Sequence, residues 1–322
     1  MTTSGSVDFT LTRNQIIRAA LLLCNGVEED ETPSPTAILD ASTFLNAFVK
    51  KINTTFPIWG TVDYTIPLYD SKQSYTIGPA GNKNVNRPLK LTMGRRTVAG
   101  ATQETPIFQE SRQGYMELPT KDSASVPNIF YYDAQLVQGV LYVWGVSSLD
   151  STPLSDGSTD QWTDSPAVSG EYYYTGSDIT AEPNYVMVNG VEFTEGILGS
   201  LADYEYAYGD NDTLGANTLY IYQTSDPDAQ ATGWVKCLTS DPDKIIVTAH
   251  RPLEDFDDSD NTPDFPDEAF LMLTFSLAEL LCPMYDISRI NYLAAKAQML
   301  NAEFLSSDTE YASFKVEPRM GR

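Results

Sequence analysis

The spacing of apolar residues changes twice along this chain of 322 residues. Near both ends, in residues 16–23 and 287–305, apolar side chains recur every three or four positions, which is typical of amphipathic helices. Between the ends, as in residues 62–68, apolar and polar side chains alternate, and this alternation predicts β-strands. The sequence therefore predicts an α+β fold, with N- and C-terminal helices packed on a central antiparallel sheet.

Two helices are expected near each end of the chain. Thr12 and Gln15 form a capping-box pattern, in which the threonine caps the first turn and the glutamine reaches back. The first helix follows this cap and stops at Gly26. The other helices are expected over residues 35–52, 269–281 and 287–305, with a break at Pro283.

The strands are expected between these helices. Residues 61–68 and 75–77, separated by a polar turn at 69–73, carry the pattern of a β-hairpin. Further strands are predicted near residues 89–93, 129–132, 140–143 and 245–248.

Residues 147–243 differ from the rest of the chain in charge. They hold 17 acidic residues and one basic residue, a balance of −16, whereas the other residues hold 27 acids and 19 bases, a balance of −8. Short aromatic and β-branched runs follow a Ser/Asp/Thr/Pro-rich stretch, and Asn189-Gly190 is a hairpin-turn pair. We expect a small all-β module inserted into a core made of residues 1–146 and 244–305, with 306–322 as a C-terminal tail.

The composition also limits the classes of function. The net charge of −24 disfavours sequence-independent DNA binding, which depends on Lys and Arg neutralising phosphates. We expect no membrane span, which needs about 20 apolar residues in a row, and no signal peptide. The three cysteines are widely spaced with no metal-ligand spacing among them, and His250 is the single histidine, so no metal site is expected. No cofactor is expected either.

Six short motifs occur in order outside the acidic module. They are SYTIGPAG (74–81), NVNRP (84–88), VPN (126–128), YYD (131–133), LYVW (141–144) and RPLEDF (251–256). In order and rough spacing they resemble the head-to-tail adaptor proteins of short-tailed bacteriophages, also called packaged-DNA stabilisation or tail accessory proteins. The resemblance covers residues 10–146 and 244–305. It departs from the family pattern at Ala80, where glycine is usual, at Gly145, where proline is usual, and in the acidic insertion.

The resemblance implies a structural virion protein and not an enzyme. Such adaptors form a homo-oligomeric ring, commonly of twelve copies, that binds under the portal protein, extends its DNA channel and retains the packaged DNA. The ring presents a platform for tail hub, nozzle or fibre proteins. It would assemble in the host cytoplasm and belong to the tail vertex of the virion, and DNA would pass through it without sequence-specific binding.

A basic cluster interrupts the otherwise acidic chain. Five positive charges lie within fourteen residues, at Lys83, Arg87, Lys90, Arg95 and Arg96. They are expected to face the DNA channel or a neighbouring subunit. The alternative is a solvated strand edge, which Lys and Arg commonly protect from pairing with another chain.

The C-terminal tail carries apolar side chains on a polar background. Tyr311, Phe314, Val316 and Arg319 are the residues expected to bind the portal, because the resemblance places this end of the chain toward it. A tail of this kind can also order only when it binds.

Other candidate sites are weaker. His250 has no nucleophile setting around it, and the aspartates 255, 257, 258, 260 and 264 lack the glycine and glutamate of an EF-hand, so a looser calcium site is the alternative to a solvated loop. Asp203, Glu205, Asp210 and Asp212 are too common in this module to indicate a glycosidase pair. The tyrosines at 172, 173, 174, 204, 206 and 208 leave one other function open, a carbohydrate-binding tail or surface protein.

Overall fold

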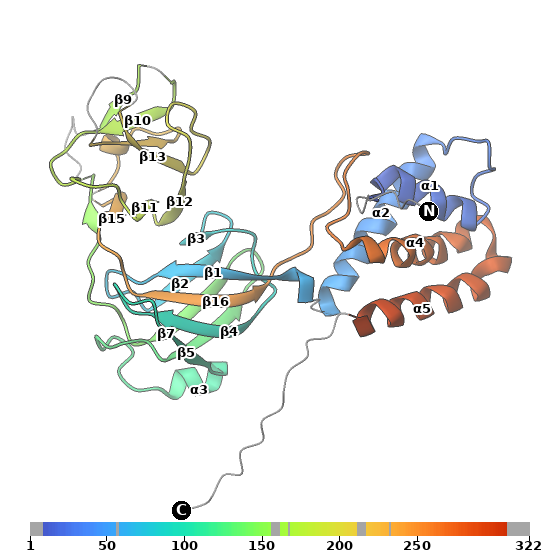
Figure 1. Ribbon diagram of the computed structural model, residues 1–322, viewed down its shortest axis with the longest axis horizontal. Coiled ribbons are helices and arrows are strands. Elements are labelled where there is room, and N and C mark those ends of the chain that lie inside the picture. The colour runs from blue at the N-terminus through green and yellow to red at the C-terminus, as the bar shows by residue number, and fades with distance from the viewer. Residues whose placement is uncertain are drawn as a thin grey trace, which may run out of the picture. The chain divides into compact units, whose positions relative to one another are not determined.

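The structure, a computed structural model, describes residues 9–55, 58–155, 162–166, 168–210, 217–231 and 233–307. The chain divides into two compact units (Figure 1). The helical unit combines Met1–Thr61 with Pro252–Arg322, and the sheet unit is Val62–Arg251. Both ends of the chain therefore contribute to one unit, while the middle of the chain forms the other.

The helical unit is built from helices that come from both ends of the chain. Within the described residues these are α1 (Arg13–Leu23), α2 (Pro35–Ile52), α4 (Phe270–Tyr285) and α5 (Ile290–Ser307). Short 3-10 turns are η1 (Asn53–Thr55), η2 (Ile58–Gly60), η4 (Asp267–Ala269) and η5 (Ile287–Arg289).

Local signals set the ends of the first two helices. The Thr12 capping box is confirmed, since the Thr12 hydroxyl accepts from the Gln15 amide and the Gln15 side chain accepts from the Thr12 amide. Helix α2 begins at Pro35 after the Ser34 cap, as predicted. The first helix ends through Asn25, whose φ of 58° is left-handed, before it reaches Gly26.

The core of the helical unit surrounds α4. This helix contacts α1, α2 and α5, and it buries Leu273, Leu277 and Leu281 completely. By length and composition alone Asp267–Tyr285 is apolar enough to cross a membrane, but 56% of that window is buried within the protein. A helix with neighbours on several sides is apolar nearly all round for that reason, so its composition is weak evidence for a membrane.

The sheet unit contains two eight-stranded sheets. The first sheet has the strand order β1-β16-β4-β5-β6-β7-β2-β3, and the second has the order β8-β15-β11-β12-β13-β14-β10-β9. The first sheet consists of β1 (Thr61–Pro67), β2 (Ser74–Gly78), β3 (Lys83–Asn84), β4 (Lys90–Thr97), β5 (Glu104–Gln109), β6 (Ile129–Ala134), β7 (Gly139–Trp144) and β16 (Lys244–His250). The second consists of β8 (Thr152–Pro153), β9 (Trp162–Asp164), β10 (Glu171–Tyr174), β11 (Tyr185–Val188), β12 (Val191–Glu195), β13 (Glu205–Gly209), β14 (Thr218–Tyr222) and β15 (Val235–Leu238). The 3-10 turn η3 (Pro227–Ala229) and the short helix α3 (Arg112–Glu117) lie in connections.

Strand pairing in the first sheet corrects one expectation. The predicted strands exist, but the hairpin between residues 61–68 and 75–77 is wrong, because β1 neighbours β16 and β2 pairs with β7 and β3. The sheet is also mixed, since β5 and β6 run parallel and so do β2 and β3. An alternating pattern marks a strand but does not choose its partner.

Strand β11 of the second sheet also contributes a side chain to the core of the first sheet. The Asn189-Gly190 turn joins β11 to β12 as an antiparallel hairpin, as predicted, and both turn residues have positive φ. Successive side chains of β11 point to opposite faces, so that Met187 packs into the core of the first sheet while Val186 and Val188 pack into the core of the second. Strand β11 therefore separates two apolar clusters.

The predicted fold class was wrong. The protein is predominantly β, with two eight-stranded sheets, one nearly barrel-shaped and the other a half-barrel, and the helices do not pack on a sheet. The buried cluster of the helical unit and that of the first sheet have no residue in common. The helices bury their apolar faces against each other. A curled sheet fills its interior with the side chains that its own strands point inward.

Candidate functional site

A set of polar contacts joins the two sheets inside the sheet unit. The Asn82 side-chain amide donates to the Gly190 carbonyl at 2.6 Å, and Lys83 forms an ion pair with Glu192 at 2.9 Å. Both contacts bring the 78–84 segment of the first sheet onto the β11–β12 hairpin of the second. The hairpin turn that the sequence predicts is therefore held at its tip by the first sheet.

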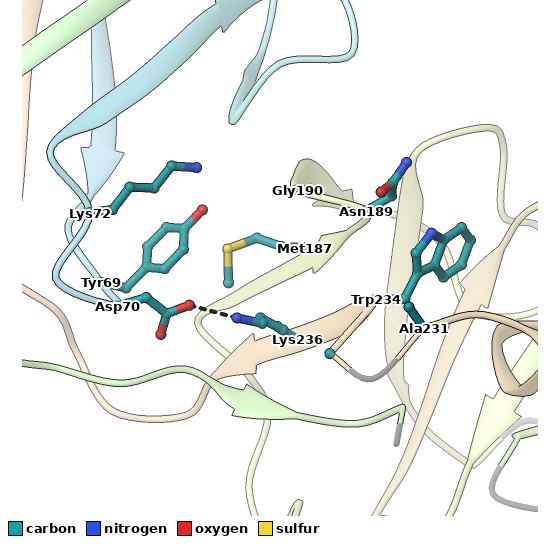
Figure 2. Close-up of a pocket in the computed structure, with 10 residues that line it drawn as sticks. Tyr69, Asp70, Lys72, Met187, Asn189, Gly190, Ala231, Trp234 and Lys236 are labelled. Atoms are coloured by element: carbon teal, nitrogen blue, oxygen red, sulfur yellow. Dashed lines mark hydrogen bonds and ion pairs between the residues drawn. The ribbon is translucent and has the colours of Figure 1, made fainter. Parts of the chain in front are cut away.

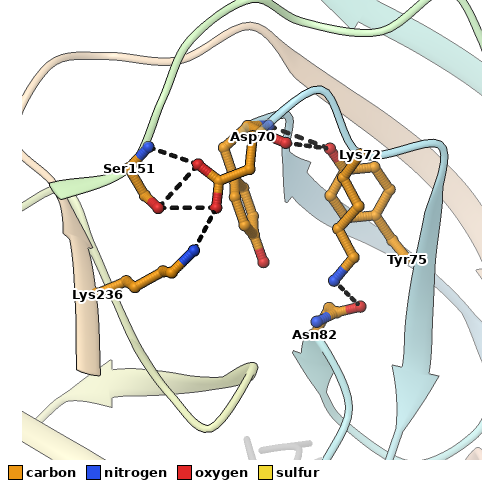
Figure 3. A network of polar contacts seen from close by, with 7 residues as sticks. Asp70, Lys72, Tyr75, Asn82, Ser151 and Lys236 are labelled. Atoms are coloured by element: carbon orange, nitrogen blue, oxygen red, sulfur yellow. Dashed lines mark hydrogen bonds and ion pairs between the residues drawn. The ribbon is translucent and has the colours of Figure 1, made fainter. Parts of the chain in front are cut away.

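A second group of contacts centres on Asp70 (Figure 3). Its carboxylate accepts from the Ser151 amide at 2.7 Å, from the Ser151 hydroxyl at 2.9 Å and from the Lys236 ammonium at 2.8 Å. Burial alone would raise the pKa of Asp70, but these hydrogen bonds outweigh it and hold the pKa below its ordinary value. Asp70 thus ties the turn after β1 to both ends of the acidic segment.

The backbone around Asp70 is shaped to make these contacts. Asp70 and Ser71 have φ angles of 52° and 50°, which lie in the left-handed region that residues with a Cβ rarely occupy. The Asp70 amide donates to the Leu149 carbonyl at 2.7 Å, so the turn is fastened to the start of the acidic segment.

Lys72 follows on the same turn and has different partners. Its ammonium donates to the Asn82 side-chain oxygen at 2.8 Å and lies 5.7 and 5.5 Å from the ring centres of Tyr69 and Tyr75. Among the residues that the structure describes, no carboxylate oxygen lies within 4 Å of this nitrogen. Burial lowers the pKa of Lys72, although Asp70 partly opposes the shift.

These residues surround a pocket of about 340 Å³ (Figure 2). Tyr69, Asp70 and Lys72 line one wall, and Asn189, Gly190 and Trp234 belong to the opposite wall. The remaining lining residues are Met187, Ala231, Gly233 and Lys236. The pocket is thus a mixed polar and aromatic hollow between the first sheet and the β11–β12 and β15 strands.

Tyr69 is the most buried polar side chain of the pocket wall. It is 5% exposed, and its hydroxyl makes no hydrogen bond with any described residue. The hydroxyl is directed toward the pocket (Figure 2), and burial raises the pKa of Tyr69. A buried hydroxyl donor that faces a hollow is available to a ligand or to water.

The five residues of the predicted basic cluster are divided between β4, the segment before it and β3. Lys90, Arg95 and Arg96 belong to β4, Arg87 precedes that strand, and Lys83 belongs to β3 at the end of the strand order. Arg95 pairs with Asp63 and Glu104, and Arg96 donates to the Pro127 carbonyl at 2.9 Å. The charges of Lys83 and Arg95 are therefore neutralised within the subunit.

The predicted portal contacts at Tyr311, Phe314, Val316 and Arg319 lie outside the described residues. The calcium alternative has no support among the described residues, where no group of three or more His, Cys, Asp or Glu is placed to hold a metal ion. In that loop, Asp255 pairs with Lys50 at 2.7 Å and Asp264 accepts from the Glu254 amide at 3.2 Å.

The remaining candidates from the sequence occupy ordinary structural positions. His250 is buried at the end of β16, and its carbonyl accepts from the Leu89 amide. The Glu205 carboxylate accepts from the Ala202 amide at 2.9 Å, and Asp212 lies outside the described residues. Among the tyrosines of the module, Tyr174 and Tyr206 belong to one apolar cluster and Tyr173 packs beside another, whereas Tyr204 is 43% exposed.

Large apolar side chains are exposed along the C-terminal helices of the helical unit. Leu280 and Met284 are four residues apart and share a face of α4, and Tyr292 and Met299 are seven apart and share a face of α5. They are 39%, 51%, 63% and 42% exposed, and Ile287 between the helices is 68% exposed. A contiguous apolar patch of this kind would mark an interaction site, whereas singly exposed apolar side chains are ordinary.

No protein-family model matches this chain, and no curated protein matches it.

No sequence pattern directly indicates the pocket. Its residues come from the stretches 69–72, 187–190 and 231–236, and no spacing within any one stretch marks a binding site. The one usable signal was the Asn189-Gly190 turn, which predicts a hairpin but says nothing of what the hairpin contacts.

Proposed function

We propose that this protein is a structural component of a bacteriophage virion, a head-to-tail adaptor that forms a ring under the portal. The ordered motifs in the sequence support this proposal, as does the exposed apolar surface on α4 and α5. In this proposal the ring extends the DNA channel, retains the packaged DNA and carries tail hub, nozzle or fibre proteins.

The exposed apolar surface is the observation that carries the proposal. In a chain with a net charge of −24, apolar side chains at Leu280, Met284 and Tyr292 would be covered most simply by another protein surface. Identical subunits that pack through two different surfaces make heterologous contacts, and such contacts close into a ring when the rotation fits. The helical unit would then supply the contacts between subunits.

The RPLEDF motif has a structural part in the helical unit. Leu253 and Phe256 are buried in its core, and their backbone amides donate to the side chains of Asn53 and Asn46 at 3.0 and 2.9 Å. The motif therefore fixes the returning chain onto α2 and η1.

The two departures from the family pattern, at Ala80 and Gly145, both have positive φ angles. Ala80 has a φ of 55°, a left-handed angle at which glycine would be unstrained. Gly145 has a φ of 95°, which the ring of proline excludes, so the backbone here must differ from that of a relative with proline.

The test is the mass of the purified protein alone and after mixing with the portal ring of the same phage, measured by native mass spectrometry. We expect a defined ring on the portal, and the mass gives the copy number. The variant Met284→Glu should weaken ring formation at least about tenfold, since a charge in an apolar contact is costly. Leu136→Glu, at a site that is 92% exposed in the sheet unit, is the matched control. The proposal would be contradicted if the protein did not bind the portal ring, or if the M284E variant formed rings as well as wild type.

A further inference from the structure

The pocket beside Asp70 has one cation whose charge is not balanced within its walls. Asp70 pairs with Lys236, and Glu192 pairs with Lys83, so these four charges cancel in pairs. Lys72 remains, with an amide oxygen and two tyrosine rings as its described partners.

The carboxylate of Asp70 forms an ion pair with Lys236 and not with Lys72. Its two oxygens share the single proton of the Ser151 hydroxyl, which lies 2.9 Å from each, and they accept one hydrogen bond from the Ser151 amide and one from the Lys236 ammonium. Asp70 acts on Lys72 only at longer range, since among the described residues no carboxylate oxygen lies within 4 Å of the Lys72 ammonium. A directly paired anion for Lys72 would have to come from outside the described chain.

The Lys72 ammonium is held in place for such a partner. Asn82 Oδ1 accepts from Lys72 at 2.8 Å and from the Thr76 amide at 2.9 Å, and Asn82 Nδ2 donates to the Gly190 carbonyl at 2.6 Å. The asparagine is thus fixed by both sheets and fixes the lysine in turn. An ammonium has three donors and one is used, so two are left.

A second donor faces the same hollow. The Tyr69 hydroxyl is carried by a side chain that is 95% buried, given its 5% exposure, and it has no hydrogen-bond partner among the described residues. Figure 2 shows the Lys72 ammonium and the Tyr69 hydroxyl on the same wall, opposite Asn189 and Trp234. An ammonium and a phenol on one wall of a hollow are donors that suit the oxygens of a carboxylate.

We propose that this pocket binds a small organic carboxylate through Lys72 and Tyr69. The volume of about 340 Å³ lies at the lower end for ligand pockets, which favours a molecule of a few carbons. Met187 provides an apolar floor and Trp234 an aromatic wall for the carbon skeleton, while the carboxylate meets the donors. Neutral sugars would leave the Lys72 charge unbalanced and are the less suitable class. This site does not depend on the ring, and its ligand would bind the isolated subunit.

Isothermal titration calorimetry of the full chain with sodium succinate, acetate and glucose tests the proposal, with sodium chloride matching the ionic strength. We expect succinate or acetate to bind and glucose not to bind. Lys72→Met should weaken carboxylate binding about tenfold or more, and Tyr69→Phe should weaken it less, because only a neutral donor is lost.

Lys121→Met is the matched control. Lys121 also lies over a tyrosine ring, 5.5 Å from the centre of Tyr115, and also bonds to uncharged oxygens, but it is far in sequence from the pocket residues. Its loss changes the net charge equally and should leave binding unchanged. Circular dichroism should show that all variants are folded. Absence of carboxylate binding by the wild type, a K72M variant that binds as well as wild type, or equal loss in K121M would overturn the proposal.

Discussion

The ammonium of Lys83 on β3 lies 2.9 Å from the carboxylate of Glu192 on β12, and the two side chains are 19% and 7% exposed. This ion pair joins the two sheets where little water reaches it. Burial raises the pKa of Glu192 above its ordinary value, although Lys83 opposes the shift. Removing one partner of such a pair leaves a buried charge without compensation.

Lys83→Met should therefore destabilise the sheet unit in a pH-dependent way. A carboxyl whose folded-state pKa is raised favours folding fully below its unfolded-state pKa of 4.5, and this contribution is lost as the pH rises through the folded-state pKa. Without Lys83 the pKa of Glu192 rises further. We expect a loss of about 3 kcal/mol in the free energy of unfolding at pH 8 and a smaller loss at pH 5. Urea denaturation at both values measures it, and an equal loss at the two pH values would show that Glu192 is not the cause.

Asp70→Asn should also weaken the junction between the sheets, with the opposite pH dependence. The pKa of Asp70 is lowered, so its contribution is present above its unfolded-state pKa of 3.8 and is lost as the pH falls through the lower folded-state value. We expect a loss of about 2 kcal/mol at pH 7, because a charged acceptor of several hydrogen bonds is replaced. The difference from wild type should shrink below pH 3.8. Asp122→Asn, an exposed site, is the control and should change stability by less than about 0.5 kcal/mol.

The stability of the hairpin tip at Asn189-Gly190 depends on the φ angles of these two residues and not on the space around them. Gly190 has a φ of 77°, and an added Cβ would meet only the Asn82 side-chain nitrogen at 3.7 Å, an ordinary contact. Gly190→Ala should cost about 1 kcal/mol from the left-handed angle alone. Asn189→Gly, where φ is 51°, should be nearly neutral. Equal stability of the two variants in thermal unfolding would contradict this assignment.

Leu253 should contribute to the stability of the helical unit. It is 1% exposed in the helical core, so Leu253→Ala should reduce the free energy of unfolding by about 2–5 kcal/mol. Leu136→Ala, at a site that is 92% exposed, should change it by less than about 0.5 kcal/mol. The helical circular-dichroism signal during urea denaturation follows this unit, and a small effect of L253A would mean that the RPLEDF segment is not an anchor.

Truncation after Ser307 tests the expected portal contact of the tail. The shortened chain lacks Tyr311, Phe314, Val316 and Arg319. We expect unchanged thermal stability and loss of binding to the portal ring in native mass spectrometry. A separate substitution of Phe314 and Val316 by serine should reproduce the loss if the apolar side chains are responsible. Full portal binding by the truncated chain would rule out the tail as the contact.

Local features of the fold were predictable because short segments determine them. The Thr12 cap, the start of α2 at Pro35 and the Asn189-Gly190 hairpin each depend on residues within a few positions of each other. The positions of β6, β7 and β16 were likewise visible as alternating runs. Strand β5 was missed because it buries Ile107 alone and so has no alternation to detect.

The choice of partners was decided by the tertiary structure. An apolar stripe on a helix fits a sheet or another helix equally well, so the sequence could not show that α1, α2, α4 and α5 pack on each other. Strand β1 joins β16 and not β2, because pairing depends on the whole sheet and not on the nearest strand in sequence. The pocket also depends on long-range packing. Lys72 lies opposite Asn189 and Trp234, and Asn82 bonds to Gly190, only because the β11–β12 hairpin packs on the first sheet. The sequence by itself determined the helices, most strands and the turns, and long-range packing determined which surfaces are covered and which remain open.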